Sequence, residues 1–242
     1  MNMISLSRVR TRAAFVVACG VLCASSVSAQ VISAPANTFE SSFGKFSGGG
    51  TYATYAQTFK ATAAAPSLQS FTIFLGDDFG QGASLFYRAH IFEFNLTSFR
   101  LVGASLFSSA LQNGSTNVMS FDSYVFNIAG GVTLNTASTY AIVVSALGTS
   151  VSTFAGLVDG ASNAIGASSS NAYADGSAYR SPATGTLADL GLANAFQAAD
   201  HPDLAFSATF RAATVPEPGS VLLLAAGLGV VALVARRRRH AD

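Results

Sequence analysis

Hydrophobic and polar residues alternate along several short segments in the middle of the chain. The clearest is residues 204–211, in which every second residue is apolar. Successive side chains of a β-strand point to opposite faces, so this alternation predicts a strand with one buried face. Residues 70–75 and 85–91 repeat the pattern, and residues 92–94 interrupt it, which predicts a bulge there.

Other short runs of β-branched and aromatic residues stand between clusters of Gly, Ser and Asn, and no long 3.6-residue period is present. Leu134 and Tyr140, six residues apart, have the spacing of the tyrosine corner of Greek-key sandwiches. The middle of the chain is therefore predicted to be all-β, as a two-sheet antiparallel β-sandwich of jelly-roll or Greek-key type. Its further strands are expected over residues 98–108, 117–128, 132–134 and 139–146.

Turn-forming dipeptides divide these segments. Asn113-Gly114 and Gly130-Gly131 are typical of tight hairpins, and each predicts one here. The pattern weakens after residue 150, where we expect short strands around residues 151–158, long loops, and a short helix over residues 187–199.

The first 29 residues have the layout of a secretory signal peptide. A positive region with three arginines precedes an apolar run over residues 13–22, and small residues lead up to Ala29. We expect cleavage between Ala29 and Gln30. The alternative of a lipoprotein cut before Cys19 leaves an apolar region shorter than such signals use.

Both cysteines of the chain, Cys19 and Cys23, lie within this predicted signal peptide. The mature chain would then contain no thiol, which excludes disulfides and cysteine-based metal sites. A domain of roughly 180 residues is long enough to be stable through its hydrophobic core alone.

The C-terminus combines three features in a fixed order. The segment Val215-Pro216-Glu217-Pro218 favours an extended backbone, because proline cannot enter a helix interior. Residues 219–235 are 17 uncharged, mostly apolar residues, nearly enough for a helix that spans a bilayer. Four consecutive arginines follow, as the positive-inside rule predicts for a cytoplasmic anchor: Arg236, Arg237, Arg238 and Arg239.

This arrangement closely resembles the PEP-CTERM sorting signal of Gram-negative bacteria, whose motif corresponds to Pro216, Glu217 and Pro218. The resemblance implies transient anchoring in the inner membrane. It also implies processing by an exosortase, a membrane cysteine protease-transpeptidase, followed by a location at the cell surface or outside the cell. The family commonly occurs with exopolysaccharide and biofilm-matrix production. An ordinary single-span anchor predicts the same topology with an uncut tail.

The net charge of +1 hides an uneven distribution. Removing the seven arginines of the two ends leaves six basic against ten acidic residues in residues 30–212, a net charge of about −4. This acidic balance argues against nucleic-acid binding. Three regions are therefore expected: a signal peptide (1–29), a β-sandwich ectodomain (30–212) and a sorting signal (213–242).

Candidate chemistry within the ectodomain is sparse. His90, at an outward strand position, and His201, in a turn, are its only histidines, so zinc sites and catalytic triads have little support. Asp77 and Asp78 stand in a predicted turn and are weak candidates for calcium, although a solvated hairpin turn explains them better. We expect no cofactor and no enzymatic activity.

Three hypotheses for function follow. The first is a non-enzymatic structural component of the cell surface or matrix, associated with exopolysaccharide and biofilm. The second is a carbohydrate-binding module that recognises the producing cell's exopolysaccharide. The third is a hydrolase whose acidic residues converge only in the folded chain. The second hypothesis would use tyrosines to contact the sugar, namely Tyr52, Tyr55, Tyr173 and Tyr179.

Overall fold

The computed structural model describes residues 29–42, 52–77, 85–115, 117–118, 120–147, 163–182, 185–212 and 227–228. These residues form two antiparallel sheets, so the prediction of an all-β, two-sheet fold is confirmed. The predicted signal peptide and transmembrane helix lie outside the described residues, apart from Ala29, Gly227 and Leu228.

The first sheet consists of β1 (Gln30–Ala34), β2 (Thr38–Ser42), β4 (Ser67–Asp77), β8 (Asp122–Thr133), β10 (Asn163–Ser168), β13 (Asp203–Leu204) and β14 (Phe206–Arg211). The second consists of β3 (Thr54–Phe59), β5 (Phe86–Asn95), β6 (Arg100–Ser108), β7 (Gln112–Asn113), β9 (Tyr140–Ser145), β11 (Ala178–Ser181) and β12 (Gln197–Ala198). A short 3-10 helix, η2 (Leu187–Gly191), joins β11 to β12.

The chain crosses repeatedly between the two sheets. Strands β8, β4, β14 and β1 are neighbours in the first sheet, and β3, β9, β5 and β6 are neighbours in the second. Successive long strands such as β3, β4 and β5 therefore lie in alternate sheets. In the sequence, strands β10 to β13 follow β9 and precede β14.

Several predictions from the pattern are confirmed. In β14, Phe206, Ala208 and Phe210 are buried, whereas the two residues between them are only half-buried. The register of β5 against β6 shifts between Ile91 and Glu93, which is the predicted irregularity.

Three local predictions are wrong. Gly130 and Gly131 do not form a hairpin. They lie inside the single strand β8 as a bulge, where both have positive φ and the register against β4 shifts. Asn113 ends β7, which pairs with β5, and the chain then continues to the other sheet instead of turning back. The helix expected over residues 187–199 is only the five residues of η2, followed by β12.

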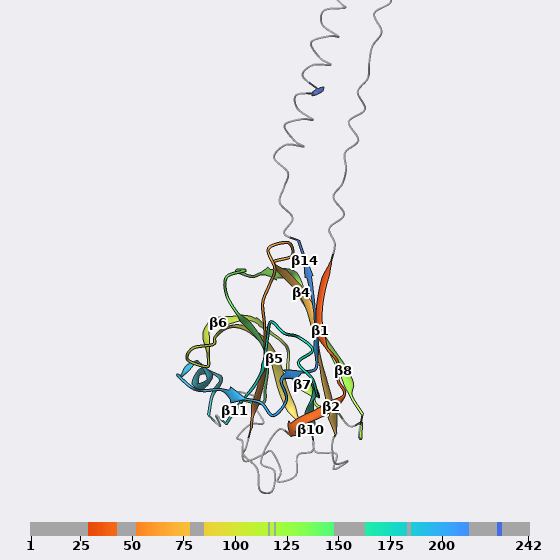
Figure 1. Cartoon of the computed structure of the whole chain (residues 1–242), viewed down its shortest axis with the longest axis vertical. Helices are drawn as coiled ribbons and strands as arrows, with labels where there is room; N and C mark the ends of the chain where they lie inside the picture. Colours follow the sequence, from red (N-terminus) through yellow and green to blue (C-terminus); the bar gives the residue numbers. More distant parts are fainter. Residues whose placement is uncertain are drawn as a thin grey trace, which may run out of the picture.

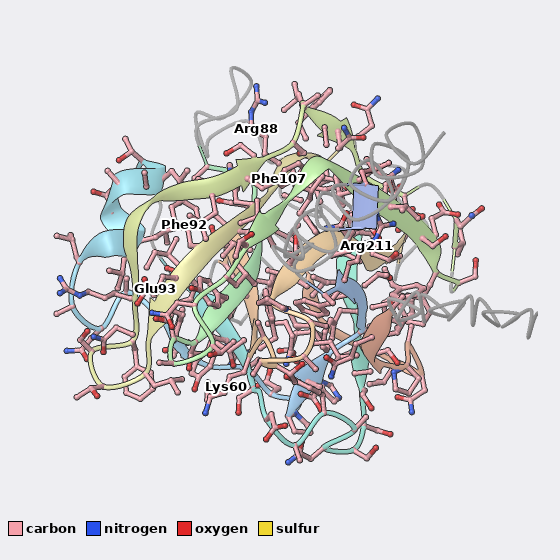
Figure 2. All side chains as sticks on the ribbon, turned by 90° about the horizontal axis from the view of Figure 1, so that it is seen from above. Lys60, Arg88, Phe92, Glu93, Phe107 and Arg211 are labelled. Carbon is pink, nitrogen blue, oxygen red and sulfur yellow. The ribbon has the colours of Figure 1, made fainter. Side chains whose placement is uncertain are left out.

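The main core fills the space between the sheets and is built largely from aromatic rings. Phe71 of β4 stacks on Phe126 of β8 at a centroid distance of 5.0 Å and meets Phe107 of β6 edge-on at 5.6 Å. Figure 2 shows side chains filling the space between the ribbons of the two sheets. Such aromatic pairs add to the large apolar area that each ring removes from water.

A second, smaller core covers the outer face of the second sheet. Phe94 of β5 contacts Tyr179 of β11 and Phe196, with centroid distances of 5.0 and 5.4 Å. Leu190 of η2 is fully buried in the same cluster. The segment from β11 to β12 is therefore packed onto the sandwich.

The first and last strands pair with each other. Gln30 lies opposite Phe210, and Arg211 lies opposite Ser67. Figure 1 shows β1, β4 and β14 meeting at the upper end of the domain and β2 and β10 at the lower end. We call the upper end the β1–β14 end; it comprises Gln30, residues 60–66, residues 134–139 and Arg211.

Short hydrogen-bonded turns close the β1–β14 end. The Asn135 N–H donates to the Tyr140 hydroxyl at 2.8 Å, which is the bond of a tyrosine corner and confirms that prediction. The Thr62 hydroxyl donates to Gln30 Oε1 at 2.5 Å and so connects the turn after β3 to the first residue of β1.

Candidate functional site

The sorting residues predicted from the sequence lie largely outside the described part of the chain. Val215, Pro216, Glu217 and Pro218 are outside it, as are Arg236, Arg237, Arg238 and Arg239. Ala29 is exposed and Gln30 is the first residue of β1, so the predicted signal-cleavage bond stands directly at the start of the sandwich. Among the residues described, no helix is long and apolar enough to cross a membrane.

A buried carboxylate, Glu40, lies at the centre of a cluster of polar and charged groups. Strand β2 places it inside the fold, where its side chain has no exposed surface. Its Oε1 accepts a hydrogen bond from the Asp200 N–H at 3.0 Å, and its Oε2 accepts one from the His201 N–H at 3.0 Å. A buried carboxylate must be compensated in this way, because unpaired burial of a charge is costly.

Arg180 of β11 supplies the compensating charge. Its Nη1 lies 3.4 Å from Glu40 Oε1 and 2.5 Å from Asp200 Oδ2, and its guanidinium stacks 4.4 Å above the Tyr52 ring. Burial opposes the charged form, but the hydrogen bond and charge of Asp200 outweigh it, so the pKa of Arg180 is raised. The guanidinium therefore stays positive and connects β2, Tyr52 and the turn at residue 200.

His201 belongs to this cluster. Its Nδ1 lies 2.9 Å from Glu40 Oε2, and its side chain is about a quarter exposed, so the prediction of a solvated turn holds only in part. A carboxylate that orients one imidazole nitrogen is one component of a hydrolytic triad. In the described part of the chain, however, no hydroxyl side chain hydrogen-bonds His201.

His90 points away from the main core, as predicted, but it is buried with only 3% of its surface exposed. Its Nδ1 lies 2.8 Å from Ser108 Oγ, and its Nε2 has no hydrogen-bond partner among the described residues. Burial, with a smaller contribution from Arg88, lowers the pKa of His90 to about 4. An imidazole of this basicity is a poor general base near neutral pH.

The four tyrosines proposed for sugar binding are in different environments. Tyr55 is fully buried in the main core and Tyr179 is buried in the second core, so neither can present a ring face to a ligand. Burial raises the pKa of Tyr55 well above its usual range. Tyr173 is half-buried, with its ring edge-on to Phe206. Tyr52 is also half-buried, and its hydroxyl accepts a hydrogen bond from the Gln197 amide at 3.0 Å.

Asp77 does not stand in a solvated turn. It is the last residue of β4 and is buried, opposite Asn163 of β10, and its N–H donates to the Asn117 carbonyl at 2.9 Å. Asp78 lies outside the described residues. Within the described ranges, no group of three His, Cys, Asp or Glu side chains is placed to hold a metal ion.

A shallow groove of about 430 Å³ lies between β6 and η2 on the outer face of the second sheet. Its lining combines apolar side chains such as Leu101 and Leu187 with Arg100 and Ser105. The Arg100 guanidinium donates to the Gly191 carbonyl at 3.4 Å across this groove.

Sequence reasoning missed the central members of the polar cluster, Glu40 and Arg180. The alternation around β2 gives no hint that Glu40 faces inward, because the charge contradicts the apolar pattern of a buried position. Arg180 is 140 positions away in the sequence, so only the fold shows that the two residues pair.

Comparison with known proteins identifies the C-terminus. A family model of the PEP-CTERM protein-sorting motif matches residues 214–239. No curated protein and no solved structure matched the chain. The resemblance of the C-terminal segment to this signal is thus confirmed, and the motif indicates a protein that is exported and sorted by an exosortase to the outside of the cell.

Proposed function

Because the chain carries a PEP-CTERM sorting motif, we propose that it is a jelly-roll domain that serves as a non-enzymatic component of the cell surface or matrix, associated with exopolysaccharide. The matched motif over residues 214–239 carries this proposal. In this account signal peptidase cuts after Ala29, the tail anchors the chain in the inner membrane, and exosortase then removes the tail.

The strand order supports the jelly-roll assignment. Neighbours β1-β14-β4-β8 in one sheet and β3-β9-β5-β6 in the other correspond to eight strands that interleave as two Greek keys. Jelly rolls serve as binding and structural modules in many contexts, so the fold is compatible with the role without identifying it.

The chemistry of the histidines supports a non-enzymatic role. His90 is buried with a lowered pKa, and the neighbouring Arg88 disfavours the imidazolium that a general base would form. The Glu40 carboxylate, which orients His201, is already used by two backbone N–H groups and Arg180. Both histidines have roles that packing and hydrogen bonding explain.

Substitution of the motif tests the sorting step. In the producing strain, the double variant Pro216→Ala/Glu217→Ala is expected to accumulate in the membrane fraction with its tail attached. The matched control, Pro35→Ala, changes an exposed proline outside the motif and should be processed like the wild type. Normal processing of the double variant would contradict exosortase sorting through this motif.

The surface around Tyr52 favours carbohydrate binding as a second candidate. The Tyr52 ring, the Gln197 amide and the Asp200 carboxylate lie together, with Arg180 stacked on the ring. An aromatic ring beside hydrogen-bond donors and acceptors can stack on a sugar ring and bond its hydroxyl groups.

Affinity electrophoresis in the producing strain's exopolysaccharide tests this candidate. Gln197→Ala is expected to raise the Kd for the polysaccharide by about tenfold, because it removes an exposed amide that would hydrogen-bond the sugar. Asp175→Asn, an exposed acid in another turn, is the control and should bind like the wild type. Equal retardation of both variants and the wild type would exclude this surface.

A further inference from the structure

The pairing of β1 with β14 brings both ends of the domain to one place. Gln30, the residue after the predicted signal-peptidase cut, lies opposite Phe210, at the end of the last strand. Residues opposite each other in an antiparallel pair have Cα atoms about 5 Å apart. The two segments that would enter the membrane therefore leave the domain from neighbouring positions.

The connection from β14 to the motif is short. β14 ends at Arg211, and four residue steps lead to Val215, which span at most about 14 Å when fully extended. Eight steps lead to Gly219, the start of the apolar run, and span at most about 28 Å. The 11 residues of β4, by comparison, extend roughly 35 Å. The tether is too short to let the opposite end of the domain face the membrane.

We propose, on the basis of the proposed sorting function, that the β1–β14 end faces the membrane and the exosortase while the tail is attached. The opposite end, where β2 and β10 lie in Figure 1, then points outward.

The chemistry of the β1–β14 end fits a position close to the membrane surface. Its turn over residues 62–65 carries only threonine and alanine side chains, so nothing bulky prevents close approach. Lys60 and Arg211 are exposed there, and Figure 2 looks down onto this end with both labelled. Basic side chains are favoured beside anionic lipid headgroups.

The absence of cysteine from the predicted mature chain allows a direct test. Full-length protein would be isolated from a strain that lacks exosortase, so that the tail is retained, and reconstituted into liposomes that contain acceptor-labelled lipid. Two single-cysteine variants would carry the donor dye: Ala64→Cys at the β1–β14 end and Ser123→Cys toward the opposite end. Both residues are exposed, and Ser123 lies opposite Phe74 in β4.

Energy transfer to the bilayer is expected to be at least about twofold more efficient from position 64 than from position 123, because roughly 25 Å of β4 separates them. Thermal unfolding of each labelled variant checks that the fold is retained. Equal or reversed efficiencies on membrane-bound protein would overturn the orientation and leave the sorting function intact. Failure of tail-bearing protein to associate with liposomes would contradict both.

Discussion

The two ends of the sandwich are built differently. At the β1–β14 end, β3 is joined to β4 by seven residues and β8 to β9 by six. At the opposite end, β4 is joined to β5 by eight residues and β9 to β10 by 17. The connection from β9 to β10 is the longest of these four, and it leaves β9 at the end that we place away from the membrane.

The two ends also differ in the kind of side chain that is buried. Near the β1–β14 end, Phe59 contacts Tyr140 and Phe210, with centroid distances of 6.1 and 5.9 Å. Away from it, Glu40 and Asp77 are buried. A buried polar group lowers the free energy of unfolding unless it is hydrogen-bonded or ion-paired. Proteins often keep such groups at functional or strained sites. The buried aromatic contacts of Phe59 thus lie near the β1–β14 end, and the two buried carboxylates lie away from it.

The largest effect is expected from the apolar end. Phe59→Ala removes a fully buried ring from the contact between the sheets and should lower the free energy of unfolding by about 3–5 kcal/mol. Urea denaturation of the ectodomain measures this. Phe99→Ala, at a ring that is 37% exposed, is the control and should cost clearly less. Equal losses would show that the β1–β14 end is no better packed than a surface turn.

The buried histidine predicts a dependence of stability on pH. His90 has a pKa of about 4 in the folded chain against 6.5 when unfolded, so between these values the unfolded chain binds the extra proton. Its contribution is fully present above pH 6.5 and is lost as the pH falls toward 4, by about 3 kcal/mol in total.

Thermal unfolding at pH 7 and pH 4.5 tests this contribution. His90→Gln should lose much of the acid sensitivity, because glutamine does not titrate. His201→Gln keeps His90 and should retain the contribution that His90 makes. An unchanged pH dependence in His90→Gln would mean that the pKa of His90 is not lowered in the folded chain.

A smaller loss is expected at the polar cluster. Glu40→Gln keeps the volume but replaces one carboxylate oxygen by a donor that faces an N–H group, and leaves Arg180 with one acidic partner fewer. We expect a loss of about 2 kcal/mol, measured by urea denaturation. Glu93→Gln is the control, since Glu93 is half-buried and accepts one hydrogen bond from Ser138. Equal free energies of unfolding for Glu40→Gln and Glu93→Gln would show that the cluster around Glu40 contributes nothing to stability.

The smallest effect is expected at the tyrosine corner. Tyr140→Phe removes only the hydroxyl that accepts the Asn135 N–H and should cost about 1 kcal/mol. Tyr173→Phe, whose hydroxyl accepts the Lys60 N–H at the longer distance of 3.2 Å, is the matched comparison and should cost less. A larger loss of unfolding free energy in Tyr173→Phe than in Tyr140→Phe would show that the hydrogen bond of the corner is the less stabilising of the two.

The sequence was informative wherever one local rule decided the structure. Alternation in residues 204–211 predicted β14, and the spacing of Leu134 and Tyr140 predicted the corner, because both depend on neighbouring residues. Gly130-Gly131 was misinterpreted because the same positive φ serves a hairpin or a bulge, and only the partner strand β4 decides between them.

The polar cluster could not be predicted, for a related reason. Glu40, Arg180 and His201 come from distant parts of the chain, and they meet only because β2 of the first sheet, β11 of the second sheet and the turn before β13 come together in the fold. Burial of Tyr55 and Tyr179 also depends on tertiary packing, since a tyrosine in a strand can face either side. The sorting motif, by contrast, consists of consecutive residues, so it could be recognised without knowledge of the fold.

The intact mass of the mature protein tests the central claim most directly. Protein recovered from outside wild-type cells is expected to begin at Gln30 and to end before Arg236, whereas protein from cells without exosortase should retain the chain through Asp242. A mature, secreted protein that begins at Gln30 and still ends at Asp242 would contradict exosortase processing.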